Sequence, residues 1–94
     1  MSAPDVDALF EKAYKLLSDA EYDKAIALFS EVIGRSPNLE GAWGNRGYAL
    51  LEIGRDKEAL ADFDMTISLN GQDAWAHAFR SQALYHLGRF EEAL

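Results

Sequence analysis

The sequence has 94 residues, the size of one domain, and 49% of them are hydrophobic, as in folded globular chains and unlike disordered ones. Its formal charge of −7, with nine Lys and Arg scattered among sixteen Asp and Glu, disfavours nucleic acid and anionic membrane surfaces as partners. The sequence contains no apolar run long enough to span a bilayer, no signal peptide and no cysteine, so we expect a cytoplasmic protein without disulfides or thiolate metal sites.

Two helices are predicted in the first part of the chain, after a leader of residues 1–5. The first covers about residues 7–18 and has one apolar face, made of Leu9, Ala13 and Leu16. The second covers about residues 22–35. Pro37 prevents its continuation, because proline lacks an amide N–H and disfavours helical geometry at the residue before it.

Three more helices, separated by short turns, are predicted in the rest of the chain. Two are predicted over about residues 39–53 and 56–69, and Asn70–Gly71 favours a left-handed stop after the second of them. Asp73 is placed to cap a fifth helix that runs to about Leu87 and ends at Gly88. Residues 89–94 begin a sixth helix, and we expect the chain to be a piece of a longer array.

Residues of similar size recur every 34 positions, which indicates a repeat array. The period is defined by five residues of the middle unit: Trp43, Gly47, Leu50, Ala59 and Phe63. One period earlier the same positions hold Leu9, Ala13, Leu16, Ala25 and Phe29, and one period later they include His77, Ser81, Leu84 and Ala93. Positions that hold a small residue in one unit hold a small residue in the other units as well. We therefore expect the helices to cross closely at Ala25, Phe29, Gly47, Ala59 and Phe63.

The spacing of these five residues resembles the tetratricopeptide repeat, and the resemblance covers residues 6–94. It implies an all-α fold in which antiparallel helix-turn-helix units stack into a right-handed α-solenoid, here about two and a half units. We place the leader at residues 1–5, unit 1 at 6–39, unit 2 at 40–73 and a truncated unit 3 at 74–94. The family usually serves as a non-catalytic scaffold that binds a protein or peptide, and this is the function we expect.

Catalytic and cofactor sites find little support in the sequence. His77 and His86 are nine residues apart, which puts them on opposite sides of one helix, one near the core and one on the surface. Gly41, Gly44 and Gly47 lack the Lys-Ser/Thr of a phosphate-binding loop. With no nucleophile–base pair either, we expect no enzyme activity, no cofactor and no metal site.

The resemblance implies that the first helix of each unit lines a concave groove. Aromatic residues spaced four apart share one helical face, and they lie beside the apolar face already assigned to the core. This second stripe suggests an aromatic-lined groove for a partner segment, although the same residues could pack against the neighbouring unit. The candidate partner-binding residues are Phe10, Tyr14, Asn45, Tyr48, Trp75, Phe79 and Gln82.

One subclass of the family holds the acidic C-terminal tails of chaperones with Lys, Asn and Arg side chains. At the corresponding positions this sequence has Phe10, Tyr14, Asn45, Trp75 and Phe79, so only the Asn matches. Together with the charge of −7, this departure argues against a chaperone tail as the partner. The alternative function is self-association into a homodimer through the unfinished third unit, whose exposed apolar end would comprise Leu84, Phe90 and Leu94.

Overall fold

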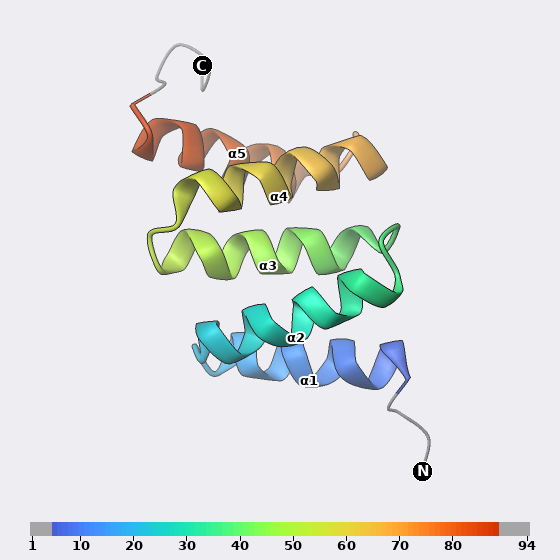
Figure 1. Cartoon of the computed structure of the whole chain (residues 1–94). Helices are drawn as coiled ribbons and strands as arrows, with labels where there is room; N and C mark the ends of the chain where they lie inside the picture. Colours follow the sequence, from blue (N-terminus) through green and yellow to red (C-terminus); the bar gives the residue numbers. More distant parts are fainter. Residues whose placement is uncertain (1–4, 89–94) are drawn as a thin grey trace.

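The structure, a computed structural model, describes residues 5–88 and consists there of five α-helices (Figure 1). The helices are α1 (Val6–Ser18), α2 (Tyr22–Arg35), α3 (Glu40–Glu52), α4 (Asp56–Leu69) and α5 (Ala74–His86). The predicted helices agree with these bounds to within one residue. The predictions for the leader before Asp5 and for a sixth helix over residues 89–94 lie outside the described residues.

Neighbouring helices run antiparallel and stack in chain order from α1 to α5 (Figure 1). The helix α3 also contacts α1 and α5, so α1, α3 and α5 form one layer of the stack. The helices of this layer start at Val6, Glu40 and Ala74, each one sequence period after the last. Within residues 5–88 the fold is therefore all-α, with two helix pairs and one further helix, α5.

Two aspartates cap helix N-termini by accepting a hydrogen bond from a backbone amide of the first turn. The Ala8 amide donates to Asp5 Oδ1 at 2.8 Å, and the Ala76 amide donates to Asp73 Oδ1 at 3.0 Å, which confirms the predicted cap of α5. Gly88 follows α5 with φ of +80°, in the left-handed region that glycine adopts readily.

The predicted left-handed stop at Asn70–Gly71 is wrong. Asn70 has an extended backbone with φ of −148°, and its amide still donates to the Thr66 carbonyl at 2.8 Å. Its side-chain oxygen accepts from the Gln72 amide at 3.1 Å, so an Asn-centred turn ends α4 and no left-handed residue is needed.

Ala20 has φ of +59° in the turn where the later units have Gly54 and Gly88. A residue with a Cβ in this region destabilises the folded state by about 1–2 kcal/mol. Part of this cost is offset because alanine loses less backbone entropy on folding than glycine does. We expect Ala20→Gly to raise the free energy of unfolding by about 0.5–1 kcal/mol in urea denaturation. Gly54→Ala is the matched control and should lower it; an Ala20→Gly protein no more stable than the original would contradict the assignment of strain.

The predicted crossings form the centre of the core. Ala25, Phe29, Ala59 and Phe63 are fully buried, and Gly47 is buried as well. One apolar cluster joins α1, α2 and α3, and a second joins α3, α4 and α5. The periodic pattern of small and large residues thus becomes two successive layers of the same packing.

Gly47 and Gly44 lie one turn apart on α3 but differ in the space around them. A Cβ on Gly47 would lie 2.8 Å from Phe63 Cε1, whereas one on Gly44 would lie 3.5 Å from Thr66 Oγ1, an ordinary contact. We expect Gly47→Ala to lower the free energy of unfolding by about 1–3 kcal/mol through overpacking. Gly44→Ala should raise it by about 0.5–1 kcal/mol, because alanine favours the helix. Urea titration of both variants checks this; equal effects would contradict the close crossing.

Leu84 does not belong to an exposed apolar end. It is fully buried, because it lies on the buried face of α5 together with Ala76 and Ala83. It occupies the position that Leu50, also buried, holds in the preceding unit. The prediction of an exposed Leu84 is therefore wrong, and Phe90 and Leu94 lie outside the described residues.

None of the helices within residues 5–88 combines the length and the apolar character that crossing a bilayer requires.

Candidate functional site

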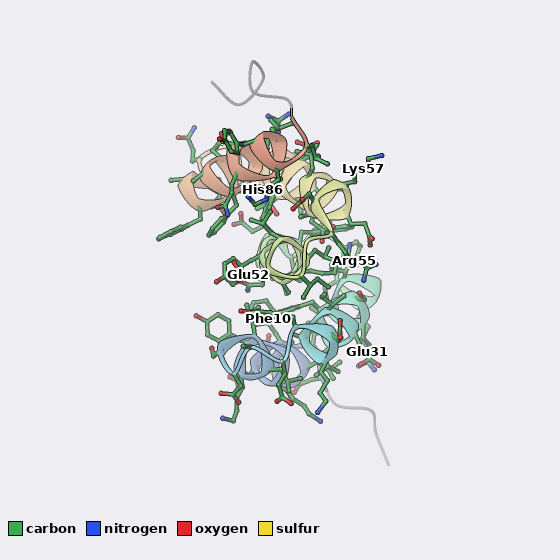
Figure 2. All side chains as sticks on the ribbon, turned by 90° about the vertical axis from the view of Figure 1, so that its left-hand side faces the viewer. Phe10, Glu31, Glu52, Arg55, Lys57 and His86 are labelled. Atoms are coloured by element: carbon green, nitrogen blue, oxygen red, sulfur yellow. The ribbon has the colours of Figure 1, made fainter. Side chains whose placement is uncertain are left out.

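A hollow of about 480 Å³ opens on the layer formed by α1, α3 and α5. Figure 2 shows α2 and α4 on the opposite side of the stack, with Arg55, Lys57 and Glu31 labelled there. We name the hollow the aromatic groove and define it by its lining: Tyr14, Leu17, Gly41, Gly44, Asn45, Tyr48, Phe63, Asp73, Trp75, Ala76 and Phe79.

Four aromatic rings form a continuous wall of this groove, and Phe79 is at its centre. The Phe79 ring stacks on Trp75 and on Phe63, with centroids 5.9 Å and 5.8 Å apart. The Tyr48 ring lies 5.3 Å from it in a tilted arrangement. Trp75 and Phe79 share one face of α5 because they are four residues apart, as the sequence predicts. Three helices therefore contribute to a single aromatic surface.

The outer part of the groove leaves large rings in solvent. Trp75 is 74% exposed and Tyr14, which reaches the groove from α1, is 53% exposed. Exposed aromatic rings that line a hollow present much apolar area for a partner, and their polar tips can form hydrogen bonds at its edge. This arrangement differs from core packing, where the same rings would be covered.

Polar groups occur at two points among the aromatic rings. The Asn45 side chain makes no hydrogen bond or ion pair within residues 5–88, so its amide can donate and accept at once. Burial raises the pKa of Tyr48, and the carboxylate of Glu52 raises it further. The Tyr48 hydroxyl therefore remains protonated at neutral pH and can donate a hydrogen bond.

Five of the seven predicted partner-binding residues line the groove together: Tyr14, Asn45, Tyr48, Trp75 and Phe79. Phe10 instead packs edge-on against Phe29, with ring centroids 5.6 Å apart, and contributes to the core. Gln82 is exposed and does not belong to the lining.

Six lining residues were not among the seven predicted ones: Leu17, Gly41, Gly44, Phe63, Asp73 and Ala76. In the sequence Phe63 reads only as a crossing residue and Asp73 only as a helix cap. Both descriptions hold in the structure, but neither local pattern indicates that the side chain also reaches the groove.

Neither histidine lies in the core, so the prediction of one near the core is wrong. Both are exposed: His77 Nε2 lies 2.9 Å from the Gly71 carbonyl, and His86 Nδ1 lies 3.3 Å from Asp56 Oδ1. In the part of the chain that the structure describes, no three His, Cys, Asp or Glu side chains come together as metal ligands.

Behind the groove, a buried ion pair ties α3 to α4. Arg46 donates to both oxygens of Asp62, from Nε at 2.8 Å and from Nη2 at 2.7 Å, and a third bond from Nη1 reaches Ser30 Oγ on α2 at 3.1 Å. Burial raises the pKa of the Asp62 carboxyl, while the bonds from Arg46 oppose that shift. The hydrogen bond to Asp62 raises the pKa of Arg46. We therefore take the pair as ionised at neutral pH, holding α3, which carries Asn45 and Tyr48, against two other helices.

Known proteins resemble the chain in sequence as well as in structure. STIP1 homolog of Dictyostelium discoideum is 33% identical over 76 residues, which cover 81% of this chain and 14% of that protein. The tetratricopeptide repeat and J domain-containing co-chaperone DNJ1 of Cryptococcus neoformans is 29% identical over 92 residues, which cover 98% of this chain and 18% of that protein. The chain thus spans less than a fifth of these relatives, and no protein-family model matches it.

Solved structures of tetratricopeptide domains also resemble the chain. The second tetratricopeptide domain of Spaghetti (RPAP3), bound to the HSP90 peptide SRMEEVD, superposes with a TM-score of 0.90 and is 26% identical. The match covers 94% of this chain and 82% of that one. The chain is a tetratricopeptide-repeat module, a helical-repeat domain of the protein-binding class to which these neighbours belong.

Proposed function

We propose that the chain is a non-catalytic scaffold that binds a peptide segment of another protein in the aromatic groove. The observation that carries the proposal is that two aromatic rings of the groove, Trp75 and Tyr14, stand in solvent around a hollow and not inside the core. Anchoring residues in groove interfaces are commonly aromatic or aliphatic side chains that fill such pockets.

The polar groups of the groove suit the backbone of such a segment. The Asn45 amide can pair with one carbonyl and one N–H of a peptide, and the Tyr48 hydroxyl can donate to a further carbonyl. Gly41 and Gly44 add backbone of α3 to the lining. We expect an extended or helical peptide that contributes apolar anchors.

An acidic chaperone tail fits this groove poorly. The neighbour in RPAP3 is bound to SRMEEVD, a peptide with three acidic side chains. The lining of the aromatic groove contains no Lys or Arg, so a peptide carboxylate would lose its water without gaining a cationic partner. We therefore propose that apolar anchors, and not acidic side chains, determine the affinity here.

The test is selection of binders from a random twelve-residue peptide library, followed by calorimetry with variants of the chain. Trp75→Ala and Tyr14→Ala change exposed side chains and should leave the fold intact. We expect each to weaken the selected peptides by about tenfold or more, as hot-spot aromatics do. Met65→Ala, an exposed apolar position on α4 outside the groove, is the control and should change Kd by less than about twofold. A library without binders, or binders that ignore both groove variants, would refute the proposal.

A further inference from the structure

The aromatic groove has one charged side chain in its lining, and that charge is negative. Asp73 precedes α5 and reaches the hollow two residues before Trp75. Its Oδ1 caps the helix, whereas Oδ2 has no hydrogen bond or ion pair within residues 5–88. A second carboxylate, that of Glu52, acts on Tyr48 closely enough to raise the pKa of that phenol. The charged side chains in and beside the groove are therefore acidic.

The cations of the chain itself are engaged elsewhere. Six of the eight Lys and Arg within residues 5–88 form ion pairs with carboxylates, none of them in the groove lining: Lys15, Lys24, Arg35, Arg46, Arg55 and Arg80. The remaining two, Lys12 and Lys57, are also absent from the lining, so within residues 5–88 no Lys or Arg of the groove neutralises Asp73. The formal charge of −7 attracts an external cation at long range.

Aromatic faces favour the same kind of ligand. A guanidinium or ammonium group within about 6 Å of a ring centroid is attracted by the negative face of the ring, and Trp and Tyr are among the best partners. The chain contains its own example of the contact, since Arg46 Cζ lies 5.1 Å above the centroid of the Trp43 ring. Trp75 offers a similar indole, largely exposed and close in sequence to Asp73.

We propose that the segment bound in the aromatic groove carries a Lys or Arg next to its apolar anchor, with the cationic group over the exposed rings of Trp75 or Tyr14 and paired with Asp73. This inference rests on the proposed peptide-binding function and adds the charge of the partner to it. The occupant is a basic-apolar peptide segment, opposite in charge to the acidic peptide that the RPAP3 domain binds.

Three amidated, acetylated heptapeptides with the same anchors test the charge: SFLKKVS, SFLQQVS and SFLEEVS. By calorimetry at low ionic strength, we expect the Lys peptide to bind about 3- to 30-fold tighter than the Gln peptide, and the Glu peptide to bind weakest. High salt should reduce the difference without abolishing binding of the Gln peptide.

Asp73→Asn is the decisive variant, because Asn caps helices as well as Asp does and the fold should persist. It should bring the Lys and Gln peptides to within about twofold of each other and leave the Gln peptide unchanged. Asp23→Asn on α2 removes the same charge away from the groove and should retain the preference. Equal binding of the Lys and Gln peptides, or equal loss of preference in both variants, overturns this inference alone. If none of the three binds although the library yields groove binders, this inference fails alone; if the library also yields none, the proposed function fails with it.

Discussion

Replacing Arg46 with Met is expected to lower the free energy of unfolding by about 3 kcal/mol. The side chain of Asp62 is only 4% exposed, so removing its partner leaves a buried carboxylate without a compensating charge, a change that costs about 3–5 kcal/mol in other proteins. We take the lower end because the Arg46 side chain is 21% exposed and water can partly replace it. Urea denaturation at pH 7 measures the loss.

The pH dependence of this variant separates a charge effect from lost packing. Burial raises the pKa of Asp62, and without Arg46 the opposing hydrogen bonds are gone, so the pKa rises further. A carboxyl whose folded pKa lies above its unfolded value stabilises the fold when protonated, and this contribution is lost as pH rises through the folded pKa. The deficit of Arg46→Met relative to the original chain should therefore shrink between pH 7 and pH 5.

A double variant provides the control. Arg46→Met with Asp62→Leu removes both charges together, and apolar replacement of a buried ion pair is often neutral or stabilising. We expect the double variant to recover most of the lost stability at pH 7. A deficit that is the same at both pH values and persists in the double variant would mean that Arg46 stabilises the fold by packing alone.

Truncating Phe63 to Ala should cost about 3–5 kcal/mol, the usual range for a fully buried aromatic ring. Its ring fills the space over Gly47 and stacks on Phe79, so its removal leaves a cavity between α3, α4 and α5. The free energy of unfolding from urea titration is the measurement. Met65→Ala on the same helix is exposed and should change it by about 0.5 kcal/mol or less. Similar losses for both would contradict the central place of Phe63.

The helices could be predicted closely because their determinants are local and occur in successive units. Ala25 and Ala59 permit close crossings, and Asp73 and Gly88 mark the two ends of α5. Asn70 shows the limit of local reasoning. A left-handed stop and an Asn-centred turn need the same residue type, and only the backbone distinguishes them.

The groove could be predicted in part, since helical spacing places side chains on a face but does not say what covers that face. Phe10 and Tyr14 lie one turn apart on α1, yet only Tyr14 lines the groove. Phe10 packs edge-on against Phe29, with its ring beside Gly41 on α3. Phe63 and Asp73 join the lining through contacts between helices, which no local pattern encodes.

Chemical-shift mapping with a library-selected peptide tests peptide binding in the groove most directly. The side-chain amide of Asn45 and the indole N–H of Trp75 report from inside the groove, and the backbone amides of Arg55 and Lys57 report from the opposite side of the stack (Figure 2). We predict large shifts for the first pair, with Tyr48 and Phe79, and none for the second. Shifts confined to Arg55 and Lys57, with Asn45 and Trp75 unmoved at saturation, would contradict the account.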